Sequence, residues 1–186
     1  MTDATVFSTR RRGSSAERDP GDASADVGKN GAMLLDGIHH VAILTSDTDR
    51  LIRFYESIFD AVVEDSTVDG PVRLTFLNIG PGTELNIFEI EDNHQAEHQT
   101  PMFERGRIDH LGVRAASIDA FIEIRQRLID QEATDGFITD FGPVLSLFFT
   151  DPDGLEAEVC VPNPDATPGQ RNPPGTPAKL LRQQRT

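Results

Sequence analysis

The sequence predicts an α+β fold made of two copies of one unit, in which a strand is followed by a helix and then by three further strands. The first observation is an internal repeat, because residues 37–91 are echoed by residues 108–161. The second is that each copy opens on a β-rich strand with a histidine, His40 or His110, followed two residues later by a small side chain. The third is an amphipathic helix after each of these strands. A duplication of this kind defines the fold as a whole.

The elements of the first copy follow from turn and helix signals. Residues 39–44 are β-rich, and Ser46 or Asp47 can cap a helix whose apolar residues recur at helical spacing. Asp-Gly-Pro and Gly-Pro-Gly then separate three strands, which are expected at residues 61–68, 72–78 and 84–90.

The second copy repeats this order. Residues 110–114 form the first strand, and Ser117 is the expected cap of the helix that follows. An Asp-Pro-Asp-Gly turn precedes the last of three strands, which are expected near residues 136–139, 144–150 and 155–161. Residues 92–107 form a polar linker between the two copies.

The two ends of the chain differ in composition from the repeats. Residues 1–33 are rich in Ser, Asp, Ala, Gly and Arg, and residues 163–186 are rich in Pro, Gly, Arg and Gln. Neither segment has a periodic apolar pattern. We therefore expect a disordered N-terminal tail, one domain over residues 34–162 and a flexible Pro-rich C-terminal tail.

The net charge of −14 excludes two classes of partner. An acidic protein repels phosphate backbones and anionic membrane surfaces, so neither nucleic acid nor a membrane is expected. No apolar run reaches the roughly eighteen residues of a membrane span, and no apolar stretch of signal-peptide type follows the arginines near the N-terminus. The only cysteine, Cys160, excludes an internal disulfide. We therefore expect a cytoplasmic protein with a small-molecule partner.

The motifs resemble those of the vicinal-oxygen-chelate superfamily, the glyoxalase, bleomycin-resistance and extradiol-dioxygenase group. The resemblance covers about residues 36–162. It rests on His-His-Val-Ala-Ile with Arg-Phe-Tyr-Glu in the next helix, on Asp-His-Leu-Gly-Val, and on Asp-Pro-Asp-Gly-Leu-Glu-Ala-Glu-Val. It implies that two βαβββ modules pair into a half-open curved sheet. The assembly is left open, with a homodimer as the candidate.

In this family, metal ligands come from the first strand of each repeat and from the last strand. Transferred to this sequence, the ligands are His40, His110 and Glu158. Side-chain alternation agrees, because His40 and Ala42 share the strand face opposite the β-branched residues that would pack against the helix. Two imidazoles and a carboxylate with open positions suit Fe2+, and also Mn2+, Co2+, Ni2+ or Zn2+. Any one of the three alone is more often an ordinary strand residue, so the metal hypothesis depends on all three at matched positions.

Two positions depart from the patterns of known enzymes in this family. Asn86 aligns with Glu158, where glyoxalase I and methylmalonyl-CoA epimerase carry a carboxylate, and an amide cannot act as a general base. Phe148 stands where extradiol dioxygenases carry a tyrosine, and their upstream histidine has no counterpart near residues 139–141. Cleavage of a catechol ring is therefore disfavoured. Asn86, Phe148 and Arg114 remain candidates for contacts with the substrate.

The resemblance thus implies a metal-dependent enzyme that acts on a small oxygen-rich organic substrate chelated to a divalent metal. Glu158 is the catalytic candidate, and the reaction class is lyase, isomerase or oxygenase. The alternative is a metal-independent protein that sequesters a small molecule, as bleomycin-resistance proteins do. The intact set of three candidate ligands favours the enzyme, whereas Asn86 and Phe148, which lack proton-transfer chemistry, favour the binding protein.

Overall fold

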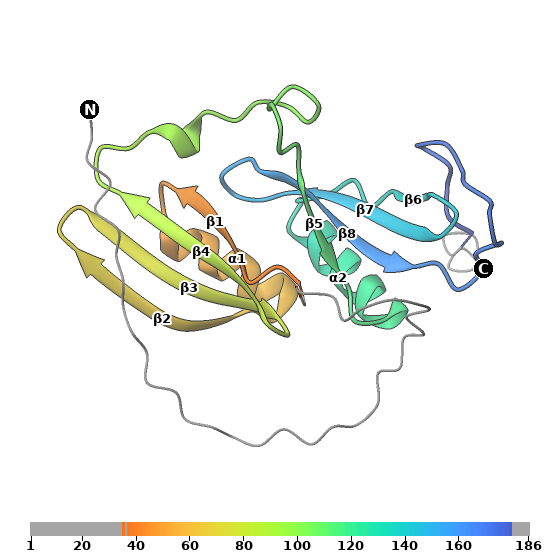
Figure 1. The fold of residues 1–186 in the computed structure, drawn as a ribbon, viewed down its shortest axis with the longest axis horizontal. Coiled ribbons are helices and arrows are strands. Elements are labelled where there is room, and N and C mark those ends of the chain that lie inside the picture. Colours follow the sequence, from red (N-terminus) through yellow and green to blue (C-terminus); the bar gives the residue numbers. More distant parts are fainter. Residues whose placement is uncertain (1–34, 36, 180–186) are drawn as a thin grey trace, which may run out of the picture. The chain divides into compact units, whose positions relative to one another are not determined.

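The computed structural model describes residue 35 and residues 37–179, and it confirms the α+β fold with two repeated modules (Figure 1). The first module consists, in chain order, of β1 (His40–Thr45), α1 (Thr48–Phe59), β2 (Val62–Asp69), β3 (Val72–Gly80) and β4 (Thr83–Ile90). A short 3-10 helix, η1 (Gln95–Glu97), lies in the connection. The second module consists of β5 (Leu111–Arg114), α2 (Ile118–Asp130), β6 (Ile138–Asp140), β7 (Val144–Thr150) and β8 (Glu156–Pro162). The N-terminal tail predicted at residues 1–33 lies outside the described residues.

Each module forms its own four-stranded mixed sheet. The strand order is β1-β4-β3-β2 in the first sheet and β5-β8-β7-β6 in the second. In each sheet the first strand of the module pairs in parallel with the last strand, and the registers correspond: Ala42 lies opposite Asn86, and Gly112 lies opposite Glu158. The alignment of Asn86 with Glu158 made from the sequence therefore holds in three dimensions.

The helices begin where the sequence predicts. The Asp47 side chain accepts a hydrogen bond from the backbone N–H of Arg50 at 2.9 Å, and the Ser117 hydroxyl accepts one from the N–H of Ala120 at 3.1 Å. Such caps satisfy N–H groups that have no partner within the helix. Each helix buries part of its apolar face completely: Leu51 and Ile58 of α1 and Phe121 and Leu128 of α2 have no exposed surface.

The two modules share one apolar core at their helices. Arg127 of α2 donates to the carbonyl of Ile58 at 3.1 Å and to the carboxylate of Asp60 at 2.7 Å, both at the C-terminal end of α1. A cation at this position satisfies carbonyls that the helix leaves unpaired. Phe149 of β7 stacks on Phe54 of α1 with ring centroids 6.2 Å apart. The buried cluster accordingly contains residues from both modules.

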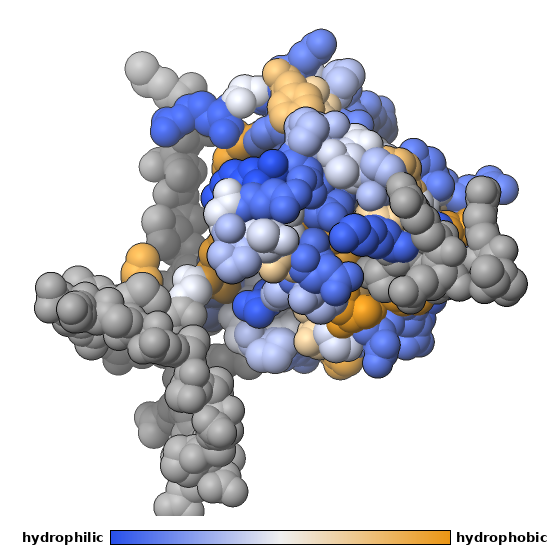
Figure 2. All heavy atoms as spheres, turned by 90° about the vertical axis from the view of Figure 1, so that its right-hand side faces the viewer, coloured by the Kyte–Doolittle hydropathy of each residue, from blue (hydrophilic) through white to orange (hydrophobic). Residues whose placement is uncertain are grey.

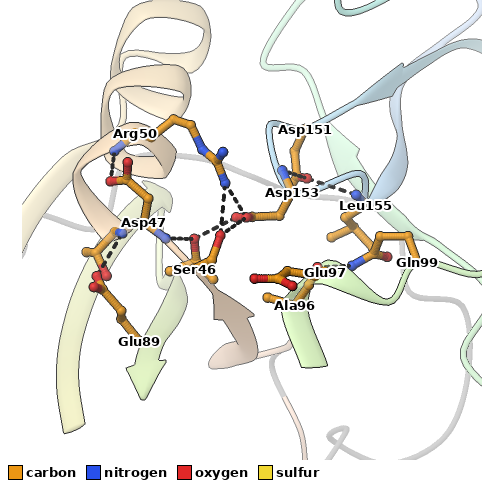
Figure 3. Close-up of polar contacts among 12 residues, drawn as sticks. Ser46, Asp47, Arg50, Glu89, Ala96, Glu97, Gln99, Asp151, Asp153 and Leu155 are labelled. Atoms are coloured by element: carbon orange, nitrogen blue, oxygen red, sulfur yellow. Dashed lines mark hydrogen bonds and ion pairs between the residues drawn. The ribbon is translucent and has the colours of Figure 1, made fainter. Parts of the chain in front are cut away.

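A second link between the modules is the turn between β7 and β8, which approaches the start of α1 (Figure 3). Asp153 in this turn accepts a hydrogen bond from the Thr45 hydroxyl at 2.6 Å and forms an ion pair with Arg50. Asp151 holds the turn itself, because one of its carboxylate oxygens accepts from the backbone N–H groups of Asp153 at 2.9 Å and Leu155 at 2.8 Å. The Asp-Pro-Asp-Gly segment is thus both a turn and a connection between modules.

The structure corrects the expectation of a flexible C-terminal tail for residues 163–179. The backbone N–H of Asp140 donates to Thr176 at 2.8 Å, and the N–H of Ala178 donates to Ile138 at 3.0 Å, around an antiparallel bridge between Thr139 and Pro177. Ala178 is buried, with 1% of its surface exposed. The segment pairs with β6 because the edge of a sheet presents unpaired backbone groups. Residues 180–186 lie outside the described part of the chain.

Neither α1 nor α2 is long and apolar enough to cross a membrane, and no other helix in the described ranges is.

Candidate metal and ligand site

Two of the three predicted ligands lie side by side in the second module. His110 directly precedes β5, and Glu158 lies on β8, which pairs with β5 in parallel. The register places Gly112 opposite Glu158, so the imidazole two residues earlier meets the carboxylate. The distance from His110 Nε2 to Glu158 Oε1 is 3.3 Å. Both side chains are largely shielded from solvent, with 26% and 18% exposed.

Each member of this pair is held by a further polar group. His110 Nδ1 lies 2.6 Å from the Asp109 carboxylate, and the Ser146 hydroxyl donates to the other oxygen of Glu158. The hydrogen bond to Asp109 raises the pKa of His110, and the same bond lowers the pKa of Asp109. A carboxylate on the second ring nitrogen is the usual support of a histidine that binds metal, because it fixes the tautomer and the ring orientation.

The chemistry of the pair fits a cation. When neutral His110 donates from Nδ1 to Asp109, its Nε2 carries a lone pair that faces the Glu158 carboxylate. Two acceptors that face each other repel unless a proton or a cation lies between them. The pair therefore suits a metal ion as two neighbouring ligands.

Gly112 makes room for this carboxylate. A Cβ atom at Gly112 would lie 3.3 Å from Glu158 Oε1, which is tighter than most such contacts. Ala42 takes the equivalent place in the first module, opposite Asn86. Asn86 Oδ1 is buried and has no hydrogen-bond partner among the described residues.

His110 and Glu158 open into a cavity of about 880 Å³, a size typical of small-molecule sites. The ring of Phe148, a predicted substrate contact, lines this cavity and meets His110 edge-on with centroids 6.0 Å apart. Met102 and Phe103 line it as well, so the connection between modules, expected to be a polar linker, contributes apolar side chains to the site.

Two further side chains flank the pair. Cys160 lines the cavity beside Glu158, and burial raises the pKa of its thiol to about 11, which keeps it neutral. Arg114, another predicted substrate contact, lines a second cavity of about 540 Å³ that also includes Glu158 and Cys160. Arg114 is therefore near the pair but not in the cavity that Phe148 lines.

His40 does not join His110 and Glu158 in this chain. Its side chain is exposed, and its Nδ1 lies 3.0 Å from Nδ1 of His39. Within residue 35 and residues 37–179, no three His, Cys, Asp or Glu side chains are grouped so that they could hold a metal ion. The structure thus brings together two of the three predicted ligands.

Sequence reasoning missed the groups that support the pair. Asp109 stands directly before His110 in the motif used to recognise the repeat, and a carboxylate next to a candidate ligand is the signal that could have identified it. Ser146 has no comparable signal, because it reaches Glu158 only through the pairing of β7 with β8.

Comparison with known proteins gives the family. The Glyoxalase/Bleomycin resistance protein/Dioxygenase superfamily matches residues 37–159, which include both modules. The chain belongs to this superfamily. Similar proteins include a 2-epi-5-epi-valiolone epimerase from Actinomyces sp., 27% identical over 146 residues, which cover 66% of this chain and 77% of that protein. The putative ring-cleaving dioxygenase MhqA of Bacillus subtilis (strain 168) is 28% identical over 130 residues, and the match spans 66% of this chain but only 39% of that protein.

Solved structures agree on the fold of this superfamily member. A glyoxylase/bleomycin resistance protein/dioxygenase domain from Frankia sp. EAN1pec matches with a TM-score of 0.58 at 21% identity, covering 70% of this chain and 95% of that chain. A glyoxalase family protein from Enterococcus faecalis matches with a TM-score of 0.54 at 26% identity, covering 69% and 99%. The fosfomycin resistance protein FosX from Listeria monocytogenes, in a complex with Mn(II), matches with a TM-score of 0.52 at 18% identity, covering 68% and 92%.

Proposed function

We propose that this protein is a metal-dependent enzyme that binds a divalent ion through His40, His110 and Glu158 and acts on a small oxygen-rich substrate. The observation that carries the proposal is the His110–Glu158 pair, with its 3.3 Å separation and with Asp109 behind the imidazole. Imidazole and carboxylate ligands suit Fe2+, Mn2+, Co2+, Ni2+ or Zn2+. When bound, such an ion would act as a Lewis acid on a substrate oxygen.

We further propose that His40 reaches the site from a second copy of the chain. One chain supplies two ligands to the cavity, while its own His40 is exposed on β1. β1 and β5 are both terminal strands of their sheets in the described part of the chain, so each offers an open edge. A two-fold axis that sets β1 of one copy beside β5 of the other would complete two equivalent sites at once. This argument favours a homodimer.

The side chains around the ion have distinct roles in this proposal. Asp109 orients His110, and Ser146 holds one oxygen of Glu158, which leaves the other oxygen for the ion. Glu158 is the catalytic candidate, because it is the carboxylate that would lie beside a bound substrate and could take or return a proton. Asn86 cannot replace it in that role.

Among the three reaction classes, isomerase has the most support. A similar protein is named an epimerase, and its match extends over 77% of its length. The similarity to a protein named a ring-cleaving dioxygenase carries less weight, because the match spans 39% of that protein and Phe148 replaces the tyrosine that the dioxygenase pattern requires.

Metal content tests the ligand set. After stripping and reloading, the wild-type protein should bind about one divalent ion per chain. His110→Ala, Glu158→Gln and His40→Ala should each lose most of it, since two remaining ligands hold an ion weakly. His98→Ala is the matched control, because His98 is an exposed histidine outside the proposed set. Equal metal content in the wild type and His110→Ala would remove the site.

Mixing two inactive variants tests the second copy. If the site is shared, a dimer of one His40→Ala chain and one His110→Ala chain keeps one site in which all three ligands are intact. Unfolding and refolding the two variants together should therefore restore about a quarter of the wild-type metal content, as expected for random pairing in a two-fold dimer. If all three ligands came from one chain, the mixture would bind no more metal than the separate variants.

The second candidate function is metal-independent binding of a small molecule in the same cavity. The observation in its favour is the lining, which includes four phenylalanine side chains, Phe148 among them. Asn86, in place of a carboxylate, agrees with it. A ligand identified from a small-molecule library that binds equally well with and without chelator would favour this function.

A further inference from the structure

The C-terminal segment Asn172–Ala178 packs beside the cavity, and it lies outside residues 37–159, which the superfamily shares. It is fixed at both ends: the N–H of Asn172 donates to Phe141 at 3.3 Å, and the N–H of Ala178 donates to Ile138 at 3.0 Å. The segment therefore lies outside the part of the chain that the superfamily model matches, and it is attached to the second module along β6.

Between these two attachments the segment forms a tight turn. The carbonyl of Pro173 accepts from the backbone N–H of Thr176 at 3.3 Å and from its hydroxyl at 2.7 Å. Gly175 has φ +80°, a conformation that glycine adopts without strain. Two consecutive prolines restrict the backbone further. The turn presents Pro174 and Gly175 to the cavity that His110 and Glu158 line.

The lining of this cavity defines the chemistry of its ligand. Its apolar part includes Phe141, Phe148, Phe149 and Pro174, and its polar part includes His110 and Glu158. No lysine or arginine is among the described residues that line it, whereas three acidic side chains are. Without a bound metal ion, a phosphate, phosphonate or carboxylate on the ligand would meet no lysine or arginine there, so the lining disfavours an anionic ligand. The side of the molecule shown in Figure 2 is mainly hydrophilic, with apolar residues only in small patches.

The geometry points to Pro174 and Gly175 as a rigid wall of the ligand cavity, which admits an uncharged molecule with an apolar or aromatic body. The oxygen-bearing end of that molecule faces His110 and Glu158. This last placement rests on the proposed function, while the wall and the preference for an uncharged body do not. The segment then determines specificity by shape and not by charge.

Because the sequence contains no tryptophan, the fluorescence of one introduced tryptophan reports only on the surroundings of that side chain. Pro174→Trp places a single indole in the wall, and Pro173→Trp is the matched control, because both prolines of the turn are exposed but only Pro174 lines the cavity. Without any ligand, the emission maximum of Pro174→Trp should lie at a shorter wavelength than that of Pro173→Trp, since an indole in an apolar cavity is shielded from water. Equal emission maxima would contradict the wall.

Two fluorescent probes test the ligand class. N-phenyl-1-naphthylamine is uncharged, and 8-anilinonaphthalene-1-sulfonate has the same aromatic body with one sulfonate. At high ionic strength, where long-range repulsion is screened, the uncharged probe should bind at least about tenfold more tightly, because the sulfonate would lose water without gaining a cation. Equal affinities would overturn the preference for an uncharged ligand.

The same titrations locate the probe. Pro174→Trp should weaken binding of the uncharged probe by about tenfold or more by filling the cavity, and Pro174→Ala should weaken it by roughly threefold through lost apolar contact. Pro173→Trp should leave the affinity within about twofold of the wild type. Unchanged affinity in both Pro174 variants would overturn the wall. All titrations are made with chelator present, so failure of the metal proposal leaves these outcomes intact, and failure of the wall leaves the metal proposal intact.

Discussion

Glu158 on β8 owes its position to Gly112, which lies opposite it on the neighbouring strand β5. Gly112 has no side chain, and the carboxylate occupies the space that a Cβ atom would approach to 3.3 Å. In the first module the same pair of positions holds Ala42 and Asn86. The second module therefore has a carboxylate where the first has the amide of Asn86, and it has glycine where the first has Ala42. These two differences place a carboxylate ligand in the second module.

Gly112→Ala should weaken metal binding without unfolding the protein. The added methyl group must move the Glu158 carboxylate by a few tenths of an ångström, and the backbone of Gly112 does not require glycine, because its φ is not in the left-handed region. Displacement of a ligand or its support typically lowers affinity about tenfold or more. Metal titration and thermal melting of the variant and the wild type measure the two effects. Wild-type affinity in the variant would show that Glu158 is not a ligand.

At the scale of elements, the turn between β7 and β8 contains a buried carboxyl group, that of Asp151. Asp151 is 6% exposed, and burial raises the pKa of its carboxyl from 3.8 to about 6. The nearby Asp153 carboxylate adds to this effect, while hydrogen bonds from backbone N–H groups oppose it. The ionised form is thus less favourable in the folded protein than in the unfolded chain.

The stability of the protein should therefore depend on the titration of Asp151. Because the folded-state pKa of about 6 lies above 3.8, the folded protein binds the proton more tightly, and this group's contribution to the free energy of unfolding decreases as pH rises from about 4 to about 6. Two pKa units correspond to roughly 3 kcal/mol. Asp151→Asn keeps an oxygen for the backbone N–H groups and removes the charge.

Urea denaturation across this pH range measures the effect. The free energy of unfolding of Asp151→Asn should exceed that of the wild type by roughly 1–3 kcal/mol at pH 7.5. The difference should be much smaller at pH 4.5, where wild-type Asp151 is protonated. Ser46→Ala is a suitable control for the same junction, since it changes a side chain near Asp153 without touching Asp151. A constant difference between Asp151→Asn and the wild type over the whole range would contradict the pKa shift.

Most of the elements, but only part of the site, could be predicted from the sequence. Caps and turns are local signals, so Ser117 was predicted correctly as a helix start and Asp47 is one of the two candidates, Ser46 or Asp47, predicted for the other helix. Most predicted strand ends lie within one or two residues of those observed. The support of Glu158 by Ser146 arises from pairing between strands, which leaves no trace in periodicity. The docking of the C-terminal segment was missed for a similar reason, because backbone hydrogen bonds and one small buried residue, Ala178, anchor it.

At the scale of the whole molecule, the same segment should contribute to stability. A chain spanning residues 34–164 loses the backbone hydrogen bonds to β6 and the burial of Ala178, whereas a chain spanning residues 34–179 keeps both. The longer chain should melt close to the full-length protein, and the shorter one should lose roughly 1–3 kcal/mol, or about 3–10 °C. Equal melting temperatures for the two chains would show that the segment does not dock in solution.

A pair of glycine substitutions gives a matched control for that experiment. Gly142 and Gly169 both have positive φ, so alanine strains the backbone at either position. Only at Gly142 would the new Cβ atom collide with the docked segment, 2.5 Å from the carbonyl oxygen of Gln170. Gly142→Ala should therefore lower the melting temperature more than Gly169→Ala in the full-length protein. In the chain that ends at residue 164, which lacks Gln170, Gly142→Ala should lower the melting temperature less than it does in the full-length protein.

The covering of β6 also limits how copies of this chain can assemble. Of the terminal strands, β6 is covered by the protein's own C-terminal segment, and β2 carries the acidic residues Glu64, Asp65 and Asp69, which discourage pairing. The strands left for association are β1 and β5, and contacts between them under two-fold symmetry form a closed pair. An exposed β6 would offer a further strand edge with unpaired backbone groups. If that edge paired with a different strand of the next copy, the assembly would not close and copies could add without limit. In the proposed dimer, the C-terminal segment would thereby keep the assembly finite, because it removes the edge along which further copies could add.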